Sequence, residues 1–318
     1  MIETVTPTEE YAEQLDAGAY AGDWAEHQRR IQINGRQLNF VDSGARTGAG
    51  QPAVILVHGM GGRWQHWLPV LPALAEHRRV VALDLPGFGA SQRPTATPTA
   101  ETFADTAAAL CRELRIDRAV LAGHSMGGPI ALRFGIRHPQ LAAGLISVAG
   151  AVTTFSQLLG LRRLLKNLRK HPREFAAIYA EVLSAALPAP AALKRAVARS
   201  ASLRRVALFP YAYRPGELTA ADAALLVDGA GAPGVLSTAA AIGRTPDPYW
   251  GLDHLRCPLL SVVGDHDLIV PLSDTRGFAE RAPQHRTVVV EGSGHMIMLE
   301  RPRAFLDIVV PFLEQIGG

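Results

Sequence analysis

The sequence predicts an α/β fold: a mostly parallel central sheet flanked by helices, with a helical region inserted near the middle of the chain. Two observations support this prediction. Short apolar runs rich in β-branched residues alternate with stretches of helical periodicity, which is typical of βαβ units. The alternation stops near residue 152 and resumes near residue 255, so the residues between them form an insertion.

Six apolar runs are expected to be buried strands, because they are short and bounded by turn-forming or charged residues. They are residues 53–57, 79–83, 119–122, 145–148, 259–263 and 287–290. Helical patterns cover residues 67–77, 102–114, 126–137, 273–281 and 302–315. Two earlier strands, 30–33 and 37–42, flank Asn34-Gly35, which predicts a hairpin because both residues tolerate positive φ.

This pattern divides the 318 residues into three parts. Residues 1–28 form an acidic extension that we expect to be helical. Residues 29–151 and 255–318 form the α/β core. Residues 152–254, rich in Ala, Leu, Lys and Arg, form a helical cap.

Composition restricts the function classes. The chain is 48% hydrophobic and 19% charged, as in soluble globular proteins, and its net charge of +3 gives no reason to expect a nucleic-acid partner. Its two cysteines suggest no disulfide framework. The N-terminus has neither the basic start nor the apolar run of a signal peptide, and no stretch is long enough to span a membrane. We therefore expect a cytoplasmic protein.

A candidate nucleophile lies where one buried run meets a helical stretch. Gly123-His124-Ser125-Met126-Gly127 fits the pattern Gly-x-Ser-x-Gly between strand 119–122 and helix 126–137. Such a turn strains the serine backbone and exposes its hydroxyl, and it requires small residues two positions before and after. The following helix also presents its positive dipole end to a developing anion. Ser125 is therefore the predicted nucleophile.

A serine hydroxyl needs a base, usually a histidine oriented by a carboxylate. His295 lies in Gly292-Ser293-Gly294-His295, directly after the last strand, and is the predicted base. The acid is expected after strand 259–263, where Asp267 is preferred and Asp265 is the alternative. His58 precedes the serine in the chain and is interpreted as structural.

An oxyanion hole needs two backbone N–H donors. One is expected from Met126, which follows the nucleophile, and the other from Met60 in the loop after strand 53–57. Leu268 and Met296 flank the predicted catalytic atoms and are candidate pocket residues. With Met60 and Met126 they predict an apolar pocket, since methionine adapts to alkyl and aromatic groups.

Five motifs in this order resemble those of α/β-hydrolase-fold serine esterases and lipases. They are His58–Gly62, Asp84–Ser91, Gly123–Gly128, Gly264–Pro271 and Gly294–Pro302. The resemblance covers roughly residues 30–151 and 255–318. It implies the Ser–Asp–His triad above and places the insertion where this family carries its cap or lid.

The resemblance also separates related chemistries. Haloalkane dehalogenases and epoxide hydrolases of this fold use an aspartate where this chain has Ser125, so neither activity is expected. Carbon–carbon hydrolases of ring-fission products keep the serine, but often have asparagine before it and tryptophan after the histidine, where this chain has His124 and Met296. Esters are favoured, and carbon–carbon hydrolysis and perhydrolase activity remain alternatives. A ligand receptor of this fold is the non-enzymatic alternative.

The insertion contains a possible amphipathic helix. Its apolar face would contain Leu158, Leu161, Leu164, Leu165 and Leu168, and its basic face Arg162, Arg163, Lys166, Arg169 and Lys170. An ordinary cap helix over the core is the preferred interpretation, and contact with a lipid surface or an anionic substrate is the alternative. No cluster of ligand residues implies a metal or an organic cofactor. The expected partner is a small apolar ester.

Overall fold

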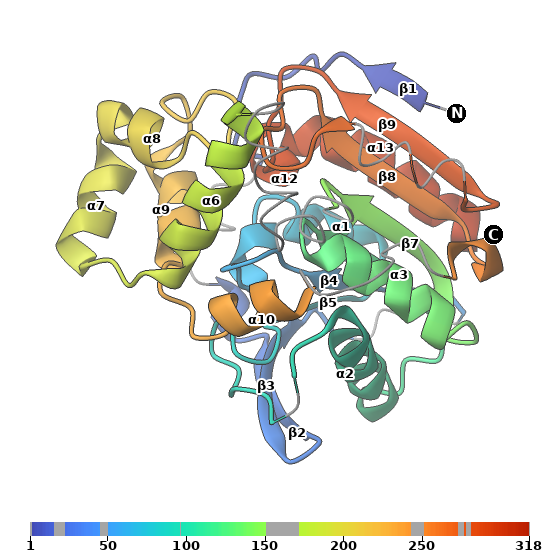
Figure 1. Cartoon of the computed structure of the whole chain (residues 1–318). Helices are drawn as coiled ribbons and strands as arrows, with labels where there is room; N and C mark the ends of the chain where they lie inside the picture. The colour runs from blue at the N-terminus through green and yellow to red at the C-terminus, as the bar shows by residue number, and fades with distance from the viewer. Residues whose placement is uncertain are drawn as a thin grey trace.

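A single twisted sheet forms the centre of the computed structural model (Figure 1), which describes residues 2–15, 23–44, 50–95, 97–150, 172–242, 251–272, 277 and 281–317. Its nine described strands are ordered β1-β9-β8-β7-β6-β4-β5-β3-β2. They are β1 (Ile2–Val5), β2 (Gln28–Ile33), β3 (Arg36–Asp42), β4 (Ala53–Val57), β5 (Val80–Leu83), β6 (Ala119–His124), β7 (Ala142–Val148), β8 (Leu259–Gly264) and β9 (His285–Val290).

Most neighbouring strands of the sheet run parallel. Only the pairings β2 with β3 and β3 with β5 are antiparallel among those described. The mostly parallel α/β fold is therefore confirmed, and each of the six buried runs contains a strand at or within a few residues of its expected position. The hairpin is also confirmed, with Ile33 opposite Arg36 and positive φ at Asn34 and Gly35.

Helices cover both faces of the sheet. The described ones in the core are α1 (Leu71–His77), α2 (Ala100–Glu113), α3 (Gly127–Arg137), α12 (Ile297–Glu300) and α13 (Pro302–Gly317), with short 3-10 turns η2 (Asp23–Ala25), η3 (Trp64–Trp67) and η4 (Leu252–His254). The helix expected from residue 67 begins instead at Leu71, where a proline occupies its first turn and η3 precedes it. Residues 273–281 lie mostly outside the described residues.

Strand periodicity assigns side chains to two hydrophobic cores. Ile55 and Val57 of β4 pack in the core beneath α2 and α3, whereas Val54 and Leu56 pack in the core beneath α1 and α13. Alternate residues of a strand face opposite sides of the sheet, so a strand covered on both faces must be apolar throughout. This explains why the central strands appear in the sequence as uninterrupted apolar runs.

Residues 2–15 of the N-terminal extension form no helix, contrary to the expectation for residues 1–28, and residues 23–25 form only the short 3-10 turn η2. Ile2–Val5 form β1, which pairs in parallel with β9, and no helix occupies residues 7–15. The segment after β1 is held by tertiary contacts: the amide of Ala12 donates to the carbonyl of Glu300, at 2.9 Å, and the amide of Ala304 donates to the Glu9 carboxylate, at 2.8 Å. Pairing with the edge of β9 and capping of α13 outweigh the local helical propensity.

Between β7 and β8 the described chain is helical, as expected for the inserted region. It forms α6 (Pro172–Ala186), α7 (Ala191–Arg199), α8 (Ala201–Ala207), α9 (Ala220–Asp228) and α10 (Val235–Ile242). Figure 1 shows α6 to α9 grouped to one side of the sheet. The leucine-rich stretch 158–168 with its basic face lies outside the described residues.

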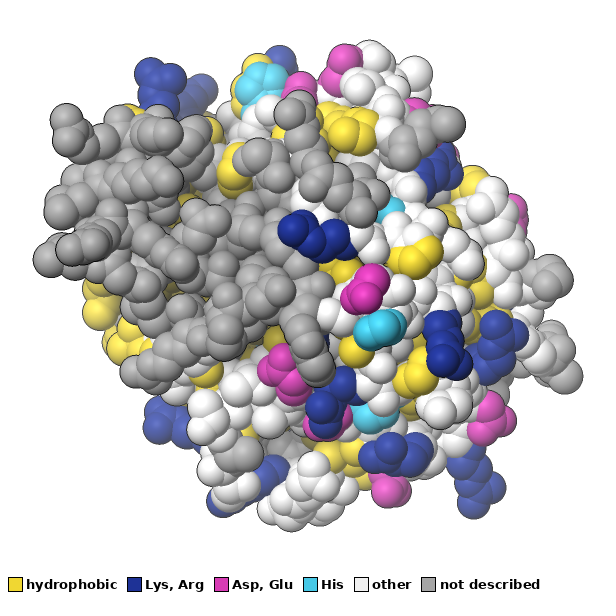
Figure 2. Space-filling view, turned by 45° about the vertical axis from the view of Figure 1, so that its right-hand side comes forward, with side chains coloured by type: hydrophobic (Ala, Val, Ile, Leu, Met, Phe, Trp, Pro, Cys, Tyr) yellow, Lys and Arg dark blue, Asp and Glu magenta, His cyan; other side chains and the backbone are white. Residues whose placement is uncertain are grey.

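The described surface mixes both signs of charge. On the face shown in Figure 2, Lys and Arg side chains alternate with Asp and Glu among the coloured residues, so this view shows no continuous basic surface. None of the described helices has the length and apolar character needed to cross a membrane.

Asp84, directly after β5, connects three segments near the carboxyl ends of the strands. Its buried carboxylate accepts hydrogen bonds from the amide of Trp64, the side chain of Asn39 and the amide of Ala90, at 2.8, 2.8 and 2.9 Å. A Cβ on Gly89 would overlap this carboxylate, so the chain can fold back onto Asp84 only because that residue is glycine.

Replacing Asp84 with alanine should lower the free energy of unfolding by about 3 kcal/mol, because three donors lose a buried acceptor. Urea denaturation of the purified variant measures this change. The matched control is Asp117→Ala, since Asp117 is exposed and should change stability by less than about 0.5 kcal/mol. Equal stability of the two variants would contradict the role assigned to Asp84.

Candidate active site

Ser125 lies on a strained turn between β6 and α3. Its φ is +52°, a left-handed conformation that residues other than glycine adopt rarely. Its amide donates to the carbonyl of Val148, at 2.8 Å, and its carbonyl accepts from the amide of Gly128, at 2.9 Å. These bonds hold the serine between the end of the sheet and the first turn of α3, as expected for a nucleophile elbow.

The glycines around Ser125 are required by close backbone contacts. A Cβ on Gly123 would overlap the carbonyl of Gly127, and a Cβ on Gly127 would lie 2.7 Å from the carbonyl oxygen of Val57. A Cβ on Gly59 would lie 2.9 Å from the Cβ of Ser125. The loop after β4 therefore packs directly against the serine, which is possible only without side chains at these positions.

Asp267 and His295 form a buried pair at the ends of β8 and β9. Nδ1 of His295 lies 2.8 Å from Oδ2 of Asp267, and both side chains are 1% exposed. The other carboxylate oxygen of Asp267 accepts from the amides of Ile269 and Val270, at 2.8 and 2.9 Å. Both oxygens of Asp267 therefore accept hydrogen bonds, and the carboxylate orients the imidazole with Nδ1 as its donor.

Asp265, the alternative acid, points elsewhere. Its Oδ1 lies 2.7 Å from Nδ1 of His266 and accepts from the amide of Ser293, at 3.2 Å. Asp265 therefore helps to hold the turn that carries His295, but its hydrogen bonds do not include the imidazole of His295.

Opposing effects act on the protonation of His295. Burial disfavours the imidazolium, but the charge and hydrogen bond of Asp267, together with the charges of Glu181 and Glu300, raise its pKa above the ordinary value of 6.5. Nε2 of His295 and Oγ of Ser125 are both buried and have no hydrogen-bond partner among the described residues. These are the two atoms between which a base and a hydroxyl nucleophile exchange a proton.

Two other histidines near the site have hydrogen bonds to backbone groups. Nδ1 of His58 lies 2.7 Å from the carbonyl of Gly59, while its Nε2 accepts from the amide of Leu85, at 3.0 Å, so both ring nitrogens are used within loops. Nε2 of His124 lies 3.0 Å from the carbonyl of His295. Burial lowers the pKa of both rings, so they act as structural groups.

Two residues are predicted to donate to an oxyanion. Met126 is the N-cap residue of α3, and Met60 is in the loop whose Gly59 packs on the serine. Among the described residues, the backbone hydrogen bonds outside helices and strands include none donated by the amide of either methionine. Their role in an oxyanion hole, which needs two free backbone donors, stays a prediction.

The comparisons with known proteins agree with this geometry. A family model described as the alpha/beta hydrolase fold matches residues 52–302, most of the chain. The chain belongs to this family.

Two curated relatives match this chain over less than half of its length. It is 41% identical over 123 residues to the dihydrolipoyllysine-residue acetyltransferase component of an acetoin cleaving system from Pseudomonas putida, covering 39% of this chain and 32% of that protein. It is 37% identical over 141 residues to the 2-hydroxy-6-oxo-2,4-heptadienoate hydrolase of Pseudomonas putida, covering 43% of this chain and 49% of the relative. The chain thus spans a third to a half of these relatives.

One solved structure covers nearly the whole hydrolase. A thermophilic esterase from Thermogutta terrifontis superposes with a TM-score of 0.66 and 26% identity, covering 92% of this chain and 99% of the esterase. The similarity therefore includes the inserted helical region as well as the sheet.

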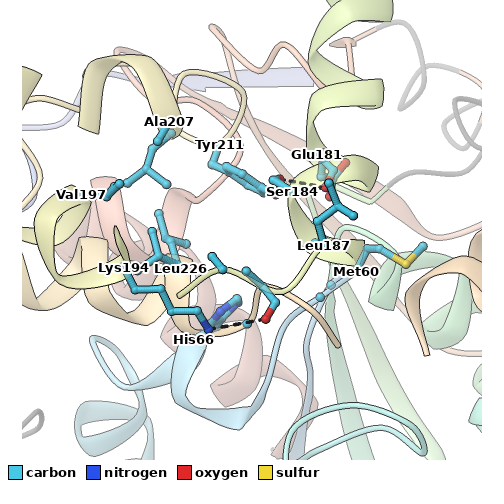
Figure 3. A pocket seen from close by; sticks show the side chains of 18 of the residues that line it. Met60, His66, Glu181, Ser184, Leu187, Lys194, Val197, Ala207, Tyr211 and Leu226 are labelled. Carbon is cyan, nitrogen blue, oxygen red and sulfur yellow. Dashed lines mark hydrogen bonds between the residues drawn. The ribbon is translucent and has the colours of Figure 1, made fainter. Parts of the chain in front are cut away.

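A cavity of about 330 Å³ opens beside the site of this hydrolase, between its core and the inserted helices. Figure 3 shows Glu181, Ser184 and Leu187 from the α6 segment on one side and Val197 and Lys194 from α7 on the other. His295, His124, Gly59, Met60 and Met296 also line it. Leu268, the other candidate pocket residue, is not part of this lining and packs against the core beneath α2 and α3.

Glu300 positions the loop that carries the histidine of this hydrolase, a role that the sequence analysis did not assign. Its fully buried carboxylate accepts from the amides of Gly294 and Met296, both at 2.9 Å, on either side of His295. It also accepts from the hydroxyl of Tyr11, at 2.6 Å, and the amide of Tyr213, at 2.8 Å. One carboxylate thus joins the N-terminal segment, the inserted region and the histidine loop.

The sequence contained part of the information that could have identified Glu300. Glu300 lies five residues after His295 and just before Pro302, within one of the motifs that carry the family resemblance. Its donors from Tyr11 and Tyr213 are distant in sequence, and only the folded chain brings them together. The described residues contain no group of three or more His, Cys, Asp or Glu side chains that could hold a metal ion.

Replacing Glu300 with glutamine should lower the free energy of unfolding by about 2 kcal/mol, because an amide NH₂ replaces one acceptor oxygen among four donors. Guanidinium denaturation measures the change. Glu314→Gln, an exposed substitution in α13, is the matched control and should be close to neutral. If both variants unfold at the same midpoint as the original protein, Glu300 does not hold this loop.

Proposed function

We propose that this alpha/beta hydrolase is a serine hydrolase that cleaves carboxylic esters of apolar substrates. Ser125 is the nucleophile, His295 the general base and Asp267 the carboxylate that orients it. The observation that carries the proposal is the buried 2.8 Å contact between Asp267 and Nδ1 of His295, taken together with the left-handed turn at Ser125. A histidine oriented by a carboxylate is what the activation of a serine hydroxyl requires, and this supports the proposal.

The proposed reaction has two steps. Nε2 of His295 accepts the proton of Ser125 as Oγ forms a bond to the ester carbon, and the amides of Met60 and Met126 stabilise the oxyanion. The bond to the alcohol oxygen then breaks, and the imidazolium gives its proton to the departing alcohol. Water repeats the sequence on the acyl-enzyme and releases the acid.

The cavity supports a small apolar substrate. Leucine, valine and methionine side chains dominate the described lining away from the histidines, and methionines lie near the proposed oxyanion site. We propose accordingly that residues 152–254 form a cap over a core of residues 29–151 and 255–318, and that the cap sets substrate size.

Carbon–carbon bond hydrolysis is a second candidate. It is favoured by the 37% identity to a 2-hydroxy-6-oxo-2,4-heptadienoate hydrolase over 141 residues. The same serine, histidine and oxyanion donors would serve that reaction. A faster rate on a ring-fission diketone acid than on any simple ester would select it.

Replacing Ser125 with alanine should reduce the hydrolysis of p-nitrophenyl esters by about 10⁴-fold or more, because the acyl-enzyme can no longer form. The measurement compares wild type and variant on acetate, butyrate, octanoate and palmitate esters. The chain-length profile of the wild type then measures the space under the cap.

Ser202→Ala, in the first turn of α8, is the control and should leave these rates unchanged. Absence of turnover on every ester by correctly folded wild-type protein would overturn the esterase proposal and leave the carbon–carbon substrates to be tested.

The pH profile tests the role of Asp267. Because the pKa of His295 is raised above 6.5, more of the base is protonated at a given pH, and kcat/KM should fall with acid below a midpoint higher than 6.5. Asp267→Asn removes the main cause of the raised pKa, so the midpoint should move to lower pH and kcat should fall by about 10⁴-fold. An unchanged midpoint in that variant would argue against the His295–Asp267 assignment.

A further inference from the structure

Glu181 is a buried carboxyl group that the proposed reaction does not use. It lies on α6, is 1% exposed and lines the cavity shown in Figure 3. Its Oε2 has no hydrogen-bond partner among the described residues. An unpaired carboxylate in an apolar cavity costs folding free energy, so a group that is retained there calls for an explanation.

Two hydroxyl groups of the cavity wall are engaged with each other and with the backbone of α6. The hydroxyl oxygens of Ser184 and Tyr211 lie 2.7 Å apart, so one donates to the other. They lie 3.0 and 3.3 Å from the backbone carbonyl oxygen of Glu181, which accepts the remaining hydroxyl proton. Neither bond involves the side chain of Glu181, and its Oε2 is left without a partner among the described residues.

Glu181 and His295 line the same cavity, so one bound molecule can contact both. The two groups also interact electrostatically. Burial raises the pKa of Glu181 to about 7, against the effect of His295 and with a smaller contribution from Asp267. A substrate that reaches His295 therefore lies in the cavity whose wall includes Glu181.

We propose that Glu181 is a specificity determinant that accepts a hydrogen bond from a hydroxyl group next to the scissile ester. The inference rests on the proposed function and deepens it from apolar esters to hydroxylated ones. The remaining cavity wall is largely apolar. A substrate that is apolar except for one hydroxyl group would therefore place its apolar part against this wall and its hydroxyl at Glu181.

A neutral hydroxyl fits better than an ammonium group. Lys194 lines the same cavity and donates to the carbonyls of Asp228 and Ala230, at 3.2 and 3.5 Å, so its positive charge lies near any bound cation. The other titratable side chains of the lining are His66, His124, His295 and Tyr211. Burial lowers the pKa of His66 and His124, whereas Asp267 raises the pKa of His295, so a bound cation would also meet the imidazolium form of His295. An ammonium group would have to lose its water shell beside Lys194.

The kinetic test uses matched ester pairs that differ by one hydroxyl. p-Nitrophenyl butyrate and 3-hydroxybutyrate place it on the acyl side, and ethyl and 2-hydroxyethyl butyrate place it on the alcohol side. In one pair, wild-type protein should have at least a tenfold higher kcat/KM for the hydroxylated ester. Glu181→Leu should reduce that ratio to near one.

Glu217→Gln, an exposed position in the inserted region, is the matched control and should retain the wild-type ratio.

A ratio near one for both pairs in the wild type, or an unchanged ratio in Glu181→Leu, would overturn the proposal. If Glu181→Leu lowers kcat/KM equally for both esters of a pair and also shifts the pH profile, the proposal is overturned as well, since Glu181 would then act through His295. A larger gain for the p-nitrophenyl ester of 4-aminobutyrate than for the hydroxy ester would assign the site to a cation instead.

A binding measurement separates this proposal from the proposed function. Ketones in which a methylene group replaces the ester oxygen have the shape of the four esters but cannot be hydrolysed, and their affinities for Ser125→Ala are measured by calorimetry. A tenfold tighter Kd for a hydroxylated ketone, lost on adding Glu181→Leu, supports the subsite even if no ester is turned over. Equal affinities within both pairs overturn it.

A stability measurement tests the premise that the carboxyl is unpaired. The unfolded chain has the ordinary carboxyl pKa near 4.5, so between that pH and about 7 the folded state holds more protons, and stability falls as pH rises through this window. Glu181→Gln should therefore have a higher Tm than wild type at pH 8, with the difference vanishing near pH 4.5. A lower Tm at pH 8 would mean that the carboxylate is satisfied within the protein and would remove the premise.

Discussion

The parallel alignment of β4, β6, β8 and β9 is the constraint on which the candidate site depends. Parallel strands present their carboxyl ends at one edge of a sheet, and the segments that follow these four strands carry Met60, Ser125, Asp267 and His295. Residues more than 200 positions apart in the chain, from Met60 to His295, are thereby carried to the same edge of the sheet. The two apolar cores hold the strands in register and so fix the spacing of the site.

Buried carboxylates then set the local geometry. Asp84 ties the loops around β3, β5 and η3, Asp267 orients His295, and Glu300 holds the loop on both sides of that histidine. Each accepts several hydrogen bonds, which compensates for the loss of water around the charge. Glu181 differs because one of its oxygens lacks such a partner within the described structure. That contrast is the reason for assigning it to recognition of a ligand.

The sequence predicted the core well because burial and tight turns there restrict the residue types at neighbouring positions. Strands covered on both faces must be apolar, the Asn34-Gly35 turn needs positive φ, and the turn at Ser125 needs glycines two residues away. The described N-terminal segment, residues 2–15, was predicted wrongly as a helix. Its residues carry no periodic apolar pattern of a strand, and its conformation comes from pairing with β9 and from contacts with α13.

By itself, the sequence determined the α/β fold, the alpha/beta hydrolase resemblance and the candidate serine and histidine, because each depends on residue types at short spacing. Only the tertiary structure decided between Asp265 and Asp267 as the partner of His295, since both follow β8 and differ only in where the loop directs them. It alone excluded Leu268 from the cavity and revealed Glu181 and Glu300. Their roles depend on burial and on distant partners, which residue spacing does not encode.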